Sequence, residues 1–519
     1  MKSHYDVIVV GFGPSGAVAA ALLGQARFNV LVIDKLHHVY EKPRAIALDH
    51  EIMRVFQQLG VAEAVAEHTE PFTPSEYYGV DGDLIKRLAV VEPPFPLGYA
   101  PSMVFTQPSV ERILRERVAA IDQIDVATGV EFTSLSQNDA GVTIEVRDEL
   151  GAAHTVSARY LIGCDGASSN VRAAAGIELE DLDFDEPWLV VDVLVNERGL
   201  AKLPKTSVQF CEPRRPSSYV IGPGNHRRWE ISLLEGEDPK YMATEEGAWS
   251  VLKRWITPED ATLWRQASYR FHALVAKQWH SGRVFIAGDA AHQQPPFLGQ
   301  GMCQGIRDVT NLVWKLKLVM ANAADAGLLD SYGQERGAHV RALTGRIKEI
   351  GKLICERDVD AARARDARLI AADGGTIKTV PRQNIIPPLE TGLLSPQPHT
   401  AIGSLFPQPT LVVNGEEVLM DAVCGSGWRI VLNAGQIQID TELLEQARAL
   451  GAQLVPIGAQ GQAYRERDGV MANWFARHGV QAALVRPDNY VYGVASDIAG
   501  VQALVEGVRQ RLAGVLAEA

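Results

Sequence analysis

The chain opens with Tyr5-Asp-Val-Ile-Val-Val-Gly-Phe-Gly-Pro-Ser-Gly16, the stretch that decides its fold class. The residues before the first glycine are rich in β-branched side chains, and residues 17–26 are rich in alanine, which favours a helix. Residues 29–34 form a second apolar run that is typical of a buried strand. The sequence therefore predicts a strand–turn–helix–strand unit, the start of a Rossmann-like α/β domain.

The three glycines of the turn have different physical tasks. Gly11 permits the tight turn, Gly13 lets a pyrophosphate approach the backbone, and Gly16 lets the helix pack closely on the strand. The free N–H groups at the start of the helix attract phosphates. Asp34 ends the second apolar run about 20 residues further on, where a carboxylate binds a ribose 2′-hydroxyl. We therefore predict a dinucleotide whose ribose carries no phosphate, as in FAD or NAD.

The composition is that of a large globular protein, with 519 residues, a formal net charge of −13 at pH 7 and 46% hydrophobic residues. The acidic balance argues against a nucleic-acid or anionic-membrane surface. No apolar run is long enough for a signal peptide or a membrane-spanning helix. The five cysteines are scattered without CxxC spacing. We therefore expect no metal site and a cytoplasmic location.

Two further motifs decide which dinucleotide binds. Residues 283–292 contain Gly288-Asp289, and residues 164–166 read Cys-Asp-Gly with Asp165 at the centre. They resemble the GD and DG motifs of class A FAD-dependent aromatic hydroxylases, the flavoprotein monooxygenases. Together with the glycine turn they stand in the family's order, with family-like gaps. The resemblance implies that FAD occupies the site and that Asp289 holds its ribityl chain.

The segment after the GD motif narrows the resemblance. Residues 293–316, which begin Gln-Gln-Pro-Pro296-Phe-Leu-Gly, closely resemble the branch that hydroxylates 3-(3-hydroxyphenyl)propionate and related phenolic acids. In the family, the carbonyl of the proline matching Pro296 lies at the flavin edge, beside the substrate hydroxyl. The turn of residues 299–302 would begin a helix whose positive end stabilises negative charge on the reduced flavin.

Two outlying positions complete the cofactor site that the resemblance implies. Arg44 matches an arginine near the FAD phosphates, and Gln107 matches a glutamine that contacts the flavin chain. A solvated surface charge and an ordinary helix-start residue are the respective alternatives. The residues expected to bind FAD are Gly11, Gly13, Ser15, Gly16, Asp34, Lys35, Arg44, Gln107, Asp165, Asp289, Pro296, Gly299, Gly301 and Met302.

The resemblance also implies a reaction. Reduced flavin reacts with O₂ to give a C4a-hydroperoxide, and an activated phenol attacks its distal oxygen. A phenolate is the better nucleophile, so a protein group should help to remove the phenolic proton. His272 is the first candidate for this group, and a structural role or contact with the nicotinamide is the alternative. Pro296 and His272 are thus the expected catalytic residues.

The wall of the substrate cavity is expected from the middle sheet of the chain. Tyr219 and Arg228 are the predicted substrate-binding residues, and ordinary sheet positions are their alternative interpretation. Sequence alone does not distinguish Arg228 from Arg214, Arg215 and Arg227 as the ligand of a substrate carboxylate.

Strand and helix patterns divide the chain into five segments. We expect residues 1–180 and 276–372 to form the two parts of the FAD-binding domain, the second with long helices. Residues 181–275 are expected to form an inserted antiparallel sheet that binds the substrate. Residues 373–410 are a proline-rich connector. Residues 411–519 resemble the thioredoxin-like C-terminal domain of phenol hydroxylase relatives, but without CxxC, so packing or dimerisation is expected of them.

The sequence thus predicts an FAD-dependent monooxygenase that uses NADH or NADPH and O₂ to hydroxylate a small phenol or phenolic acid, at the ortho position. The nicotinamide is a transient electron donor, because FAD occupies the dinucleotide fingerprint. One alternative is another FAD oxidoreductase, a halogenase or dehydrogenase; the WxWxIP motif of flavin halogenases is missing, and residues 229–231 are the nearest fragment. The other alternative is a non-catalytic FAD-binding sensor or interaction protein.

Overall fold

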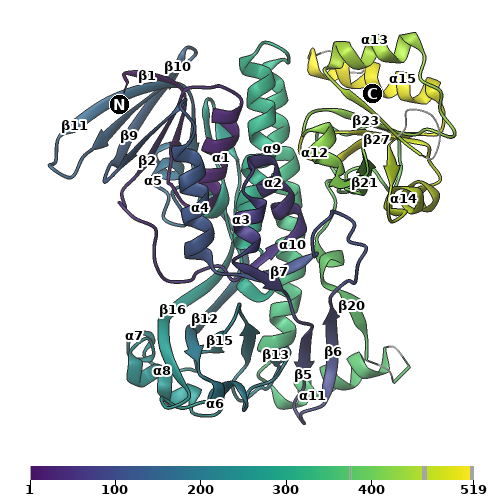
Figure 1. Ribbon diagram of the computed structural model, residues 1–519. Coiled ribbons are helices and arrows are strands. Elements are labelled where there is room, and N and C mark those ends of the chain that lie inside the picture. The colour runs from purple at the N-terminus through teal and green to yellow at the C-terminus, as the bar shows by residue number, and fades with distance from the viewer. Residues whose placement is uncertain (1, 373, 376, 459–463, 515–519) are drawn as a thin grey trace.

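The computed structural model describes residues 2–372, 374–375, 377–458 and 464–514, so the last five residues of the predicted C-terminal segment lie outside it. Figure 1 shows a mostly parallel sheet at the upper left, a large antiparallel sheet at the bottom and a smaller sheet at the upper right. Helices α9 (Gly301–Met320) and α10 (Asp330–Cys355) run between them. This arrangement confirms the predicted α/β fold class.

The parallel sheet brings the three predicted motifs to one edge. Its strands follow the order β17-β18-β11-β1-β2-β8, and β1 pairs in parallel with β2 on one side and β11 on the other. The turns after these strands therefore lie side by side at the carboxyl ends, where α/β sheets bind their ligands. The strands are β1 (His4–Val10), β2 (Val30–Asp34), β8 (Ile124–Thr128), β9 (Glu131–Asn138), β10 (Gly141–Arg147), β11 (Ala153–Gly163), β17 (His280–Ser281) and β18 (Val284–Ile286).

The antiparallel sheet has nine strands and forms one wall of the site. Two strands from the first part of the chain, one from the predicted second part of the FAD-binding domain and one from the proline-rich connector extend it beyond the predicted range of 181–275. Most neighbouring strands are antiparallel, but two of the added pairings are parallel. One face packs on α7 (Pro239–Met242) and α8 (Glu245–Leu252), and the other packs in part on α10. In spatial order the strands are β19 (His292–Gln293), β16 (Ala261–Ala276), β12 (Leu179–Val195), β15 (His226–Ser232), β14 (Ser217–Ile221), β13 (Ser207–Phe210), β5 (Ser75–Tyr78), β6 (Leu84–Ala89) and β20 (Thr379–Pro381).

The C-terminal sheet has the thioredoxin-like order β24-β23-β26-β27, with β23 and β24 parallel. It docks on the rest of the chain through buried ions: Arg486 donates to the two carboxylate oxygens of Glu335 on α10, at 2.6 and 3.0 Å. These contacts show a packing role for this part. Its elements are β21 (Thr410–Val413), β22 (Glu416–Leu419), α12 (Met420–Cys424), β23 (Arg429–Asn433), α13 (Thr441–Leu450), β24 (Gln453–Ile457), β25 (Arg465–Glu466), α14 (Val470–His478), β26 (Ala482–Val485), β27 (Val491–Ala495) and α15 (Ile498–Leu512).

Shorter elements link these sheets. No helix among the described residues is both long and apolar enough to span a membrane. The remaining elements are α1 (Pro14–Gln25), β3 (Ala47–Asp49), α2 (His50–Leu59), α3 (Ala62–Ala66), β4 (Thr69–Pro71), β7 (Ser102–Phe105), α4 (Gln107–Ala119), α5 (Asn170–Ala174), α6 (Glu197–Leu200), α11 (Val359–Ala371) and the 3₁₀ turns η1 (Gly288–Ala290), η2 (Pro296–Leu298), η3 (Ala326–Leu329) and η4 (Arg382–Ile385).

Candidate active site

The glycine turn between β1 and α1 has the geometry that its spacing predicts. Gly11 has a φ of +100°, and a Cβ there would lie 2.3 Å from the Cys164 carbonyl oxygen. A Cβ on Gly16 would lie 1.9 Å from the Gly11 carbonyl oxygen. A Cβ on Gly13, in contrast, would meet no atom within 4 Å. The first and third glycines are thus required by the protein itself, and the second leaves space in front of the α1 N-terminus.

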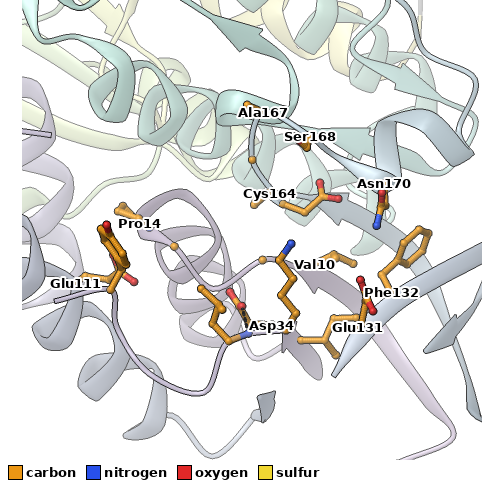
Figure 2. Close-up of a pocket in the computed structure, with 18 of the residues that line it drawn as sticks. Val10, Pro14, Asp34, Glu111, Glu131, Phe132, Cys164, Ala167, Ser168 and Asn170 are labelled. Atoms are coloured by element: carbon orange, nitrogen blue, oxygen red, sulfur yellow. Dashed lines mark hydrogen bonds between the residues drawn. The ribbon is translucent and has the colours of Figure 1, made fainter. Parts of the chain in front are cut away.

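A cavity of about 360 Å³ opens beside this turn. Figure 2 shows Asp34 at the end of β2 and Pro14 at the start of α1 on its lining, with Phe132 from β9 and Ser168 from the loop after β11. Asp34 accepts hydrogen bonds from the backbone N–H groups of Phe12 at 2.6 Å and Leu36 at 2.7 Å. These bonds fix the carboxylate at the cavity, and the predicted neighbour Lys35 also lines it.

The DG loop lies between this cavity and a second one. Asp165 lines the first cavity, and its carboxylate accepts from Ser169 Oγ at 2.5 Å and from the Val171 N–H at 3.1 Å. Gly166 has a φ of +83° and lines both cavities. The Asp165 side chain therefore shapes the loop in front of α5 while the loop backbone faces the cavities.

The GD turn after β18 contributes an unpaired carboxylate to the second cavity, which has a volume of about 450 Å³. Asp289 is exposed to this space, and no hydrogen bond to its side chain is found among the described residues. The surrounding protein atoms desolvate the carboxyl in part and thereby raise its pKa above the ordinary value. A hydroxyl donor placed in the cavity would satisfy this group.

Behind the GD turn, buried charges hold its backbone. Asp308 accepts from the Gly288 N–H at 2.9 Å, from His292 Nε2 at 2.7 Å and from Arg336 at 2.8 Å. His292 is buried away from the cavity, so its role is structural. Ser15 on α1 lines the second cavity and packs closely on Gly288.

The start of α9 faces the second cavity, together with the turn before it. Gly299 has a φ of +61°, a backbone conformation that favours glycine, and the side chain of the N-cap residue Gln300 makes no capping hydrogen bond to this 20-residue helix. A Cβ on Gly301 would meet no atom within 4 Å. Pro296 and Met302 lie on the same lining. Free N–H groups and a positive helix end thus face an open space beside Pro296.

The loop of residues 43–46 separates the two cavities and is held from both sides. Gln107 accepts from the backbone N–H groups of Ala45 at 2.5 Å and Arg44 at 3.2 Å. From the antiparallel sheet, Arg228 donates to the Arg44 carbonyl oxygen at 2.8 Å and Arg265 donates to the Pro43 carbonyl oxygen at 2.6 Å. Arg44 and Gln107 line both cavities, and their contacts with FAD stay a prediction.

The structure gives the predicted wall residues different positions. His272 lines the second cavity with a side chain that is 34% exposed, and its Nδ1 lies 3.8 Å from Asp185. Arg228 also lines it, but its Nε and Nη2 donate to buried Asp192 at 2.7 and 3.1 Å. Its guanidinium therefore positions the loop of residues 43–46. Tyr219 is buried on the opposite face of the sheet, packed on Trp229, and is not brought to either cavity.

Glu230, Tyr269 and Gln294 are among the cavity residues that the sequence prediction missed. A signal for Glu230 was present, because side chains alternate along a strand and Glu230 stands two residues after Arg228. Both amide atoms of Gln294 are buried without a hydrogen-bond partner in the described part of the chain. No local pattern marks Gln294 or Tyr269.

The residues present fit FAD. The two cavities adjoin, because they share lining residues, and an elongated ligand that extends along both would contact the predicted groups on both linings. At one end, Gly13 leaves room for phosphates at a helix N-terminus and Asp34 presents a carboxylate to a ribose. In the middle, the unpaired carboxylate of Asp289 is placed to accept a hydrogen bond from a hydroxyl group of the ligand. At the other end, the start of α9 faces the space where a flavin ring would lie. The fold and this site define a flavoprotein.

Comparison with known proteins agrees with this class. Residues 4–346 match a family model described as "FAD binding domain", and residues 403–510 match one described as "HcaD C-terminal domain". A "Probable NADH-specific resorcinol 4-hydroxylase" of Rhodococcus jostii (strain RHA1) is 37% identical over 516 residues, covering 97% of this chain and 94% of that protein. A "3-(3-hydroxy-phenyl)propionate/3-hydroxycinnamic acid hydroxylase 2" of Burkholderia vietnamiensis (strain G4 / LMG 22486) is 31% identical, covering 97% and 96%.

Solved structures share the fold at lower identity. The flavin-dependent monooxygenase PieE, in complex with FAD and substrate, superposes with a TM-score of 0.82 over 99% of both chains at 24% identity. Aklavinone-11 hydroxylase, in a ternary complex with FAD and aklavinone, gives a TM-score of 0.79 at 22% identity. The chain therefore belongs to the FAD-dependent aromatic hydroxylases, and FAD with a nicotinamide donor is its cofactor set, as the three motifs predicted.

Proposed function

We propose that this protein uses NADH and O₂ to add one hydroxyl group to a phenol or phenolic acid, ortho to an existing hydroxyl. The observation that supports this most is the second cavity, where Asp289, the start of α9 and the wall of the antiparallel sheet face one space beside Pro296. The names of the two relatives support a phenolic substrate. In balance, the phenol, O₂, NADH and a proton give the dihydroxylated product, NAD⁺ and water.

When bound, FAD would take a hydride from NADH and activate O₂ for the transfer of one oxygen atom. The residues of the chain have three tasks around it. The α1 N-terminus and Gly13 hold the phosphates, Asp34 and Asp289 accept from hydroxyl groups, and the uncapped α9 N-terminus stabilises negative charge at the ring. Apolar side chains from the sheet and η2, among them Phe271, exclude water from the reacting end.

The ortho position is part of this proposal. A phenolic hydroxyl donates electron density to the ring carbons ortho and para to it, and position 4 of resorcinol, named in the first relative, lies ortho to one of its hydroxyls and para to the other. We further infer a cytoplasmic location, supported by five cysteines that are all free in the structure. A second copy of this chain as a partner stays a proposal, as do the bounds of the five predicted segments.

The test is NADH oxidation by the purified, FAD-loaded protein, with and without a panel of phenols that includes resorcinol and 3-(3-hydroxyphenyl)propionate. We expect strong stimulation by at least one phenol and a product one oxygen atom heavier. Stimulation by halide with chlorination would favour a halogenase instead. A protein that holds FAD but responds to no phenol would refute the proposal.

A further inference from the structure

Glu230 is a buried carboxyl without a partner in the reacting end of the site. It stands on β15, its residue is only 5% exposed, and it lines the second cavity together with Pro296. Among the described residues, no hydrogen bond or ion pair to its carboxyl is found, in contrast to Arg228 on the same strand, which is paired with Asp192. A buried carboxyl without a hydrogen-bond donor costs free energy, and a ligand in the cavity that donates a hydrogen bond would offset this cost.

The strand register shows why the carboxyl faces the cavity. Glu230 pairs with Val190 on β12 and Ser218 on β14, and it alternates with Trp229 and Ile231, whose side chains lie in the core on the other face. Ser218 donates to Gln209 and is thereby occupied. The nearest strand neighbours thus leave the Glu230 carboxyl to the open space.

The charges around Glu230 are already paired with one another. On its own strand, Arg228 donates to Asp192 of β12 and to the loop of residues 43–46. On β16, Arg265 donates to the Pro43 carbonyl oxygen and to the Tyr269 hydroxyl. Burial raises the pKa of Glu230 to about 7; nearby Arg228 and Arg265 lower it, and Asp192 raises it.

The other charged groups that line this cavity are paired with protein groups or belong to the part of the cavity assigned to FAD. Arg270 is held by Asp185 at 2.8 Å, and His272 lies near the same carboxylate with about a third of its side chain exposed. Asp289 and Arg44 belong to the stretch assigned to FAD. Gln294 can donate or accept a hydrogen bond but cannot take a proton at neutral pH. Glu230 is the buried carboxyl left for a substrate.

We propose that the Glu230 carboxylate binds the phenolic hydroxyl of the substrate and accepts its proton. This rests on the proposed hydroxylase function. The phenolic O–H bond breaks, an O–H bond forms on a carboxylate oxygen, and the electron pair stays on the phenolate oxygen, which enriches the ortho carbon for oxygenation. O₂ and NADH of the proposed reaction are the oxidant and reductant. Glu230 returns the proton to solvent after the product leaves.

The test compares the FAD-loaded wild type with Glu230→Gln, which keeps the shape but cannot accept a proton. Two quantities are followed against pH: the dissociation constant of resorcinol, from the change in flavin absorbance, and kcat for coupled NADH oxidation. In the wild type, kcat should rise with pH through an apparent pKa near 7, because the carboxyl must be ionised. In Glu230→Gln this limb should vanish and kcat should fall about a hundredfold, with binding changed only a few-fold.

Two control variants separate the alternatives. Glu76→Gln removes a partly buried carboxyl on β5 of the same sheet that lines neither cavity, and it should keep the wild-type rate and pH profile. His272→Gln should also keep the limb near neutral pH. A limb that persists in Glu230→Gln, or that is lost in His272→Gln instead, would overturn the assignment of the proton to Glu230.

Two further outcomes keep the test decisive. If Glu230→Gln fails to retain FAD, Glu230→Asp replaces it: a shorter carboxylate should keep the limb with a lower kcat, and an unchanged kcat would contradict the proposal. If the wild type binds FAD but hydroxylates no phenol, the proposed function itself fails, which is a different result from a wild type that hydroxylates with no dependence on Glu230.

Discussion

The two ends of the FAD-sized space are built in opposite ways. At the phosphate end, the binding groups are backbone groups: three glycines and a helix N-terminus come from one short stretch of sequence. At the reacting end, side chains from β15, β16 and the turn before α9 meet across large sequence distances. The first end depends on the space around backbone atoms, and the second depends on which buried charges are paired.

The difference shows in what each end would lose on substitution. At the phosphate end, the effect of an added Cβ depends on the glycine: on Gly11 it collides with the Cys164 carbonyl oxygen, and on Gly13 it enters open space. At the reacting end, the same sheet face holds the paired Arg228 and the unpaired Glu230, two residues apart. At both ends, residues that serve the fold therefore stand two positions from residues that face the ligand space: Gly11 and Gly13 in the turn, Arg228 and Glu230 on the sheet.

The largest expected effect comes from Gly11→Ala. Its Cβ would collide with the Cys164 carbonyl oxygen at a φ that alanine rarely adopts, so the turn cannot form and FAD binding should be lost. Gly13→Ala is the matched control, since its Cβ meets open space: the apo protein should keep its melting temperature while FAD affinity falls. Bound flavin absorbance and thermal unfolding of both variants check this. Equal losses of stability would contradict the contrast.

Arg228→Ala should come next, at about 3–5 kcal/mol of unfolding free energy, because it leaves the buried Asp192 carboxylate without its main partner. Since Arg228 positions the loop of residues 43–46, FAD affinity should also fall. Urea unfolding with and without FAD measures both effects. A variant of wild-type stability that loses only binding of phenolic acids would instead make Arg228 a substrate ligand.

Glu230→Gln should stabilise the protein at alkaline pH. The pKa of this carboxyl is raised to about 7 in the folded protein, so the folded state holds the proton more tightly than the unfolded chain. The unfolding free energy of the wild type therefore decreases as pH rises from the ordinary glutamate pKa to about 7. Above about pH 8 the variant should be more stable by up to about 3 kcal/mol, with the gap closing near about pH 4. Paired urea titrations across this range test it; a gap independent of pH would be the opposite result.

The smallest effect is expected for Tyr219→Phe. Tyr219 lies on the face of the sheet turned away from the cavity, and its hydroxyl makes one long hydrogen bond, 3.4 Å, to the Pro204 carbonyl oxygen. The loss should be about 1 kcal/mol or less, with kcat and KM unchanged. A raised KM for phenols would show that Tyr219 contacts the substrate after all.

What could be predicted from the sequence follows the same division. The glycine turn, the GD and DG motifs and the start of α9 are contiguous, and each has a steric or electrostatic reason that can be recognised residue by residue. The fold class and FAD followed from them. The predicted roles of individual residues, such as Asp289 as a ligand of the ribityl chain, stay predictions.

The reacting end could not be predicted in the same way because it depends on strand register. The pairing of β14 with β15 places Ser218 opposite Glu230 and Tyr219 opposite Trp229, which lies on the face turned away from the cavity. Arg228 is paired because Asp192, which is 36 residues away in the sequence, lies opposite it on the neighbouring strand β12. The alternation of side chains along β15 could have added Glu230 to Arg228 as a predicted substrate-binding residue. Only a structure shows that Arg228 is paired with Asp192 and that Glu230 has no partner among the described residues.

The most direct test of hydroxylation is a single-product measurement with isotopically labelled O₂. The FAD-loaded protein, NADH and the most stimulating phenol are incubated under labelled gas, and the product is analysed by mass spectrometry and NMR. One labelled oxygen on the ring, ortho to the original hydroxyl, with one NADH consumed per product, is the predicted result. Consumption of NADH with hydrogen peroxide formed and the phenol recovered unchanged would contradict it.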